Sequence, residues 1–240
     1  MTIADRIMDF AASKGQPFRR RDLLQALVSD SVSTASAHVQ LLRLVEQGKL
    51  IKVGFGLYSL QKNDNPDFIY KPSEDEKDIA RRLKERFPLV DFCVWKPSVL
   101  VHYMRHLPAV RMTFVDVERV AMEAAFYFLQ EMLAPTLVLL NPTAQECERY
   151  ITNEDMVIVR LLVNEAPIMK VDDTPVPTLE KILVDAAGDK EMVFAQGAEY
   201  YTVFDNALES HNVNTSRLLR YASRRNRKEL IQRMINTLPS

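Results

Sequence analysis

The sequence has little cysteine, histidine or glycine, and each shortage argues against a class of protein. Cys93 and Cys147 are the two cysteines among 240 residues. They are too few for a disulfide framework or a thiolate metal site, so we expect buried free thiols. The four histidines include no pair at metal-ligand spacing, and we expect no metal and no cofactor. The six glycines form no phosphate-binding loop and no nucleophile elbow, so the chain is predicted not to be an enzyme.

Long apolar runs are also missing. No stretch approaches the roughly 20 residues that a membrane-spanning helix requires, and the first residues lack the basic segment and apolar run of a signal peptide. We therefore expect a cytoplasmic protein with no membrane partner. A length of 240 residues exceeds the usual size of one domain, roughly 100 to 150 residues, and predicts two domains.

The net charge of −1 conceals an uneven distribution. Residues 1–62 carry nine Lys or Arg against five acids, a net +4, and residues 212–240 carry seven against one, a net +6. The middle of the chain is therefore acidic, at −11. Because basic segments attract phosphate by displacing its counterions, the two ends are the places to expect nucleic acid or an acidic partner.

Residues 1–62 show three helical patterns followed by a hairpin. We expect helices over 3–13 and 19–28, and a third that begins after Ser33, whose side chain can accept a hydrogen bond from the first turn. Two strand-like runs joined by a glycine-bearing turn follow within 49–60. Because this is the element order of a winged helix-turn-helix, we predict a DNA-binding domain over residues 1–62.

The third helix divides into an apolar face and a polar stripe. In a winged helix this helix enters the major groove, where Gln40 can pair with an adenine edge and Arg43 with guanine. The three arginines 19–21 and Lys52 are expected to hold phosphates. Winged helices also serve as protein-interaction modules, and an adaptor function stays open. The predicted contacts with double-stranded operator DNA are Arg19, Arg20, Arg21, Ser33, Ser36, Gln40, Arg43 and Lys52.

A polar, turn-rich segment over 61–72 is expected to link the first domain to a second one at 73–240. Ser73 and Glu76 form the pattern of a capping box ahead of a helix. Strand-like and helical runs then alternate, which predicts an α/β domain with a partly parallel sheet and an α+β chain overall. From Thr178 onward the pattern is helical. The strands are expected at 90–95, 112–117, 136–140 and 156–162, and the helices at 98–106, 119–133 and 144–150.

Asp116 and Glu118 suggest an alternative. Two carboxylates at the end of a strand are how metal-dependent nucleotidyltransferases and nucleases hold their ions. No Gly-Ser turn precedes Asp116, however, and Glu180 and Lys181 stand adjacent in a helical pattern rather than as Glu-x-Lys on a strand. We therefore favour a structural interpretation in which Asp116 turns the strand and Glu118 begins the next helix. Replacing both carboxylates by amides is then expected to destabilise the fold only mildly.

Arginines recur at helical spacing in the basic C-terminal segment. A net +6 over this segment favours a surface that binds nucleic acid or an acidic partner. The acidic middle of the chain, including Glu180 and Asp185, is an alternative place for this charge to be absorbed. The predicted partner-binding residues are Arg217, Arg220, Arg224, Arg225 and Arg227.

Three segments resemble a known family. Gly54-Phe55-Gly56-Leu57-Tyr58 at the end of the winged helix, the helix at 178–185 and the segment 213–225 follow the order seen in the AbiEi family, antitoxins of type IV toxin-antitoxin systems. The resemblance implies a repressor of its own operon whose second domain neutralises a nucleotidyltransferase-like toxin. A DNA-binding repressor, a metal-dependent nucleic-acid enzyme and a protein-interaction adaptor are thus the three hypotheses that the sequence supports.

Overall fold

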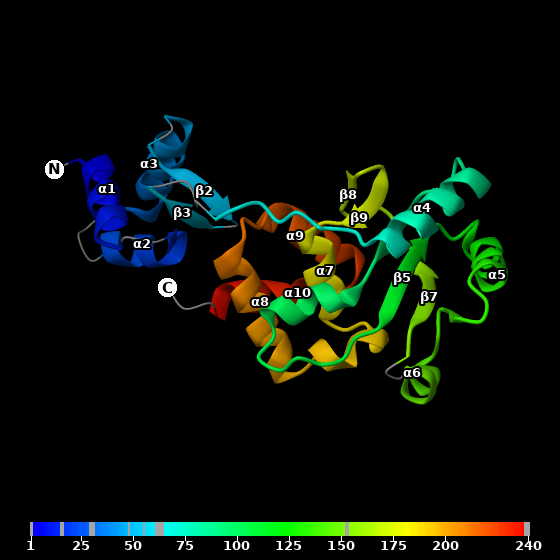
Figure 1. Cartoon of the computed structure of the whole chain (residues 1–240). Helices are drawn as coiled ribbons and strands as arrows, with labels where there is room; N and C mark the ends of the chain where they lie inside the picture. The colour runs from blue at the N-terminus through cyan, green and yellow to red at the C-terminus, as the bar shows by residue number, and fades with distance from the viewer. Residues whose placement is uncertain are drawn as a thin grey trace. The chain divides into compact units, whose positions relative to one another are not determined.

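A computed structural model describes residues 2–14, 17–28, 32–47, 49–54, 56–60, 65–151 and 154–237. The chain divides into two compact units (Figure 1), of which unit 1 is 1–66 with 214–216 and 237–240, and unit 2 is 67–213 with 217–236. Part of the predicted linker, 61–64, lies outside the described residues. Helices combined with antiparallel and mixed sheets make this an α+β protein, which confirms the predicted fold class.

Unit 1 contains the three helices and the hairpin that the sequence predicts. Its elements are α1 (Ile3–Lys14), α2 (Arg20–Val28), α3 (Thr34–Glu46), β1 (Phe18–Arg19), β2 (Ile51–Gly54) and β3 (Leu57–Ser59), with strand order β1-β3-β2. The predicted start of the second helix is wrong by one residue. Arg19 was expected to begin this helix and instead pairs with Leu57 in the sheet. The neighbouring Phe18 explains the difference, since this side chain is buried and stacks on Tyr58.

Unit 2 is built on a four-stranded sheet with the order β4-β5-β7-β6, in which β4 is antiparallel to β5 and the other pairs are parallel. This confirms a partly parallel sheet. The strands are β4 (Phe92–Trp95), β5 (Met112–Val117), β6 (Leu137–Leu140), β7 (Met156–Leu161), β8 (Ile168–Val171) and β9 (Thr174–Pro177). The helices are α4 (Glu74–Arg86), α5 (Met122–Met132), α6 (Ala144–Tyr150), α7 (Leu179–Ala186), α8 (Ala198–Ser210), α9 (Thr215–Arg224), α10 (Lys228–Thr237) and the 3-10 helices η1 (Pro97–Tyr103) and η2 (Lys190–Ala195).

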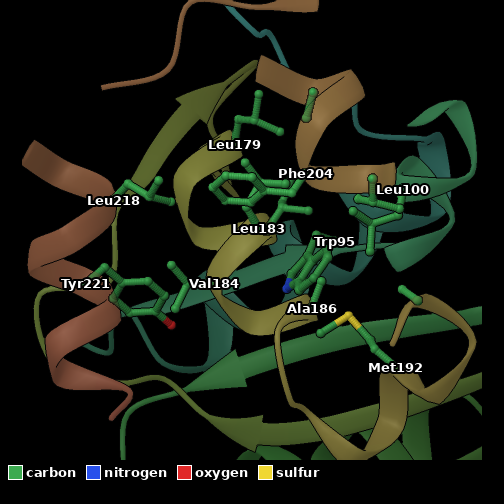
Figure 2. Packing of buried hydrophobic residues seen from close by; sticks show 14 of the residues in the cluster. Trp95, Leu100, Leu179, Leu183, Val184, Ala186, Met192, Phe204, Leu218 and Tyr221 are labelled. Carbon is green, nitrogen blue, oxygen red and sulfur yellow. The ribbon is translucent and has the colours of Figure 1, made fainter. Parts of the chain in front are cut away.

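Each face of this sheet has its own hydrophobic core, because side chains alternate along a strand. Phe114 of β5 packs on the side of α7 to α10, whereas Val115 and Val117 pack on the side of α4 and α5. Figure 1 shows α4 and α5 close to β5 and β7. In Figure 2, Leu218 and Tyr221 of α9 lie across from Val184 of α7 in the larger core. The helical C-terminal region is thus packed on the sheet rather than forming a separate tail.

The capping box and the two thiols are confirmed. The Ser73 backbone N–H and its hydroxyl donate to the Glu76 carboxylate at 2.8 and 2.7 Å, at the start of α4. Cys93 and Cys147 are buried and unpaired. Among the described residues no helix combines the length and apolar character that crossing a bilayer requires.

Two parts of unit 2 differ from expectation. The segment predicted as a helix over 98–106 is the 3-10 helix η1, which begins one residue earlier at Pro97. The hairpin of β8 and β9 was not expected from the sequence. Its turn residues Asp172 and Asp173 both have positive φ, of 48° and 61°, where Asn-Gly or Asp-Gly is the usual signal. Pro175 and Pro177 also made β9 hard to predict, since proline is rare inside strands.

Candidate nucleic-acid interface and buried charge network

α3 is fixed in unit 1 by a capped start and a buried face. The Ser33 hydroxyl accepts a hydrogen bond from the Ser36 amide at 3.2 Å, as the sequence predicts for an N-cap. Ala37, Leu41 and Leu44 of α3 are buried in the core of unit 1, which also contains residues of α1 and α2. The opposite face of α3 is therefore held toward solvent.

That solvent face differs from the predicted stripe in its centre. Ser36 and Arg43 are exposed as expected, but Gln40 is half-buried at the edge of the face. Val39 and Leu42 are 47% and 42% exposed, although the predicted DNA-reading stripe does not contain them. The available signal was that Val39 lies three residues after Ser36 and four before Arg43, and that Leu42 lies three after Val39, since residues three and four apart share a helix face. The face thus combines a hydroxyl, a guanidinium and two aliphatic side chains.

The predicted phosphate-binding cations of unit 1 lie on three elements. Arg19 is in β1, and Arg20 and Arg21 are exposed in the first turn of α2. The Arg21 side chain is 3.7 Å from the Asp22 carboxylate, a solvent-exposed contact of little energy. Lys52 is exposed in the middle of β2.

Unit 2 contains a cluster that the sequence analysis did not assemble, which we call the buried charge network. It begins at Asp116 of β5 and Arg160 of β7, which are register partners in adjacent parallel strands. Both lie near the carboxyl ends of these strands, the edge where ligands bind in open α/β sheets. The network consists of Trp95, Asp116, Arg160, Lys181, Asp185, Asp189, Glu191, Tyr221 and Arg225.

Asp116 is the centre of this network and is 1% exposed. One carboxylate oxygen accepts from Arg160 Nε and lies 2.8 Å from Arg160 Nη2. The other accepts from Trp95 Nε1 at 2.9 Å and from Lys181 Nζ at 2.6 Å. Our interpretation of Asp116 as a residue that merely turns the strand is therefore wrong. The carboxylate is an internal anchor with four donors around its two oxygens.

The guanidinium of Arg160 connects this anchor to the loop before η2. Its Nη1 donates to Asp189 at 3.1 Å and lies 3.8 Å from Glu191. Its other side stacks on Phe114, with Cζ 3.7 Å from the ring centroid. An arginine buried in a strand of apolar residues is thus satisfied by both charge and aromatic contact.

α7 and α9 meet in the same network. Lys181 Nζ also donates to Asp185 at 2.6 Å, one turn along α7. The second Asp185 oxygen accepts from the Tyr221 hydroxyl at 2.9 Å and lies 3.2 Å from Arg225 Nε. Arg225 also pairs with Asp189. The predicted pairing of Asp185 with the basic segment is therefore confirmed.

The electrostatics of the network fix most of its protonation states. Burial alone raises the pKa of Asp116, but the charges of Arg160 and Lys181 outweigh burial and hold this pKa well below its usual range. Burial alone lowers the pKa of Lys181, but Asp116 and Asp185 raise it well above its usual value. Burial, reinforced by Asp185, raises the pKa of Asp189 to about 7. Four carboxylates face three cations in the network, and Arg160 and Arg225 only partly offset the effect of burial on Asp189.

This arrangement does not resemble a metal centre or a catalytic lysine. The Asp116 oxygens already accept from three side chains, and Glu118 follows β5 with its backbone N–H donating to Asp91. No group of three or more His, Cys, Asp or Glu with metal-binding geometry occurs among the described residues. Lys181 Nζ donates to two carboxylates, which favour its charged form. A pocket of about 250 Å³ adjoins the network, and its lining includes Asn141 and Lys190.

Comparison with known proteins assigns a family to most of the chain. A model described as a family of unknown function, DUF6577, matches residues 36–239. The chain belongs to the DUF6577 family. The match begins within α3 and includes all of the buried charge network. No curated protein matches.

One solved structure similar to this DUF6577 chain is the crystal structure of the RV2827C protein from Mycobacterium tuberculosis. The two sequences are 14% identical, and the alignment covers 93% of this chain and 82% of that one. The TM-score is 0.22, which is too low to indicate a shared fold.

The basic C-terminal segment of this DUF6577 chain is only partly a free surface. Arg217 Nη1 lies 3.6 Å from Glu180, and Arg227 donates to the Gly188 carbonyl at 3.0 Å. Arg224 pairs with Glu165 on the surface, and Arg220 is exposed. The prediction that Arg225 belongs to a partner-binding surface is wrong, because this side chain turns inward to Asp185 and Asp189. The acidic middle of the chain therefore absorbs part of the basic charge.

Proposed function

We propose that the chain is a DNA-binding transcriptional repressor that acts in the cytoplasm and reads its operator with α3. The single observation that carries this proposal is the solvent face of α3, where Ser36, Val39 and Arg43 are exposed opposite a buried apolar face. The element order α1-β1-α2-α3-β2-β3 supports it, because a winged helix has this order and places its third helix in the major groove.

Arg43, Val39 and Ser36 on the solvent face of α3 each have a suitable partner on base edges. Arg43 matches the two acceptors of guanine, and the methyl groups of Val39 match the thymine methyl group. Ser36 can contact either kind of base pair. Gln40 is less accessible than expected, so we assign the main polar base contact to Arg43. Arg20, Arg21 and Lys52 would hold phosphates and set the register of the helix in the groove.

The test separates base reading from phosphate binding. Fluorescence anisotropy measures the affinity of each variant for a duplex from upstream of its own gene and for a scrambled duplex. Arg43→Ala should lose about 1 to 3 kcal/mol for the upstream duplex and little for the scrambled one. Arg20→Ala should weaken both equally and reduce the salt dependence. Lys14→Ala, which removes an exposed cation from α1, is the charge-matched control and should change neither.

Two results would contradict the proposal. The first is an upstream duplex that the parent protein binds no more tightly than the scrambled one. The second is an Arg43→Ala variant that discriminates between the duplexes as well as the parent does. A loss of both affinities in Lys14→Ala would show that net charge, and not the α3 face, governs the binding.

A second candidate function is the antitoxin-like role implied by the AbiEi resemblance. The observation that favours it is that two of the three resembling segments, 178–185 and 213–225, meet in the buried charge network through Lys181, Asp185, Tyr221 and Arg225. Co-expression with a neighbouring nucleotidyltransferase-like gene, where one exists, tests this role. Restored growth with the parent protein and with Arg43→Ala alike would assign neutralisation to unit 2, and continued toxicity would remove the antitoxin role while leaving DNA binding intact.

A further inference from the structure

A second pocket lies at the start of α7, away from the proposed DNA-reading face. Its volume is about 560 Å³, and its polar lining residues are Glu165, Thr178, Arg217 and Arg220. The remaining lining is apolar and comes from 166–169, at the start of β8. Thr178 is the N-cap residue of α7, so the pocket adjoins a helix N-terminus. The first amides of a helix have no partners within the helix, and they carry a partial positive charge.

The hydroxyl of Thr178 is the unusual feature of this pocket. The residue is 5% exposed, yet Oγ1 makes no hydrogen bond to any residue that the structure describes. An N-cap threonine normally accepts from an amide of the first turn, as Thr143 does from Glu146 at 3.2 Å. A buried hydroxyl without a partner costs about 1 to 3 kcal/mol unless a ligand supplies one.

The charge of the pocket comes from the outer face of α9. Figure 2 shows Leu218 and Tyr221 on the inner face of this helix. Arg220 is exposed, whereas Arg217, four residues before Tyr221, is half-buried at the edge of that face. Glu180 lies 3.6 Å from Arg217 and offsets its charge. Arg220, by contrast, is exposed and forms no ion pair or hydrogen bond within the described part of the chain. Glu165 at the rim is itself paired with Arg224.

We propose that this pocket binds the phosphate group of a nucleotide, held by Arg220 and the Thr178 hydroxyl, with the partial positive charge of the α7 N-terminus beside it. These donors are the kind that phosphate takes at helix N-termini. The pocket is larger than a phosphate ion, and Ile168 and Met169 offer apolar contact to the sugar or base. The phosphate comes either from a free mononucleotide or from a nucleic-acid backbone. This site is independent of base reading by α3.

The test titrates the full-length protein with inorganic phosphate and follows the amide signals of Thr178 and the first turn of α7 by nuclear magnetic resonance. Saturable shifts are expected, with a Kd on the order of 1 mM. Arg220→Ala should raise this Kd at least about tenfold, which removes one charge-assisted contact. Lys228→Ala is the matched control, because it removes an exposed cation at the start of α10 that does not line the pocket, and it should stay within about twofold.

Thr178→Val gives a second, independent readout. Without phosphate the variant should melt at or above the temperature of the parent, because an unpaired buried hydroxyl has been removed. With phosphate the parent should gain thermal stability and the variant should gain less. A variant that is simply damaged would melt lower under both conditions, and that result would count against the proposed role of the hydroxyl.

Two further binding measurements, with a mononucleotide and with a DNA duplex, identify the source of the phosphate. A nucleoside 5′-monophosphate that binds more tightly than inorganic phosphate, with the same loss in Arg220→Ala, assigns a free nucleotide. A scrambled duplex whose affinity falls in Arg220→Ala but not in Lys228→Ala assigns the nucleic-acid backbone. The proposal is overturned if phosphate gives no saturable shift, if Arg220→Ala and Lys228→Ala behave alike, or if neither nucleotide source depends on Arg220.

Discussion

Asp116→Asn is the sharpest test of the buried charge network. The amide keeps one acceptor oxygen and replaces the other with a donor, although donors from Trp95, Arg160 and Lys181 surround both positions. Whichever way the amide points, its NH2 group faces donors, and at least one buried cation loses its acceptor. Breaking a buried ion pair from one side costs about 3 to 5 kcal/mol, because the remaining charge stays buried without compensation. We therefore revise the mild destabilisation expected from the sequence to a loss of this size.

The assay uses the single tryptophan of the chain, which lies in the network. Trp95 is fully buried, so its fluorescence during urea unfolding reports on unit 2 alone. Glu118→Gln is the matched control, since it makes the same carboxylate-to-amide change two residues away, and it should stay within about 0.5 kcal/mol of the parent. The double variant with Lys181→Met should be destabilised by less than the sum of the single variants, because they share one interaction.

A loss below about 1 kcal/mol for Asp116→Asn would refute this reasoning, since an exposed ion pair contributes no more than that. Additive effects with Lys181→Met would refute it in another way, because they would mean that Asp116 and Lys181 act separately. In either case Asp116 would have only the minor structural role that the sequence first suggested.

Three further predictions concern pH, packing and charge. The raised pKa of Asp189, about 7, means that the folded state holds a proton that the unfolded state has lost above pH 5, so stability should fall by about 2 to 3 kcal/mol between pH 5 and 8. Asp189→Asn should flatten that slope in urea titrations, and an unchanged slope would contradict it. Leu218→Ala should cost about 2 to 5 kcal/mol by leaving a cavity between α9 and α7, measured by the same fluorescence. Arg225→Ala should destabilise unit 2 by more than Arg220→Ala in thermal melts, because Arg225 pairs internally and Arg220 is exposed; equal melting temperatures would restore Arg225 to the surface.

Local patterns predicted the elements well. The strands 112–117 and 156–162, the helix 144–150 and both capping signals at Ser33 and Ser73 follow from side-chain periodicity and from hydrogen bonds within a few residues. The same reasoning missed the hairpin of β8 and β9, where the turn and strand residues are not the ones usually found there. Local chemistry therefore determined most boundaries, and unusual local chemistry caused the main error.

The buried charge network was beyond such reasoning because its members are brought together by strand register. Asp116 and Arg160 are 44 residues apart and become neighbours only when β5 and β7 pair in parallel. A partial signal was present, since Arg160 interrupts a strand of buried apolar residues, and an arginine in such a position requires an anionic partner. The identity of that partner depended on the topology of the sheet. Val39 and Leu42 on α3 were missed for a simpler reason, because the predicted DNA-reading stripe was chosen from polar residues alone.

The network and the proposed phosphate pocket share two helices, and this sharing gives the network a positioning role. On α7, Lys181 and Asp185 are anchored to the sheet, to Tyr221 of α9 and to Arg225, which directly follows α9. Thr178 lies at the start of that same helix, and Arg220 lies on the outer side of α9. Because buried, fully paired charges hold helices in one geometry, the backbone positions of Thr178 and Arg220 are kept at a fixed separation before any ligand arrives. Inner charges that bind nothing themselves thereby determine the shape of the outer site.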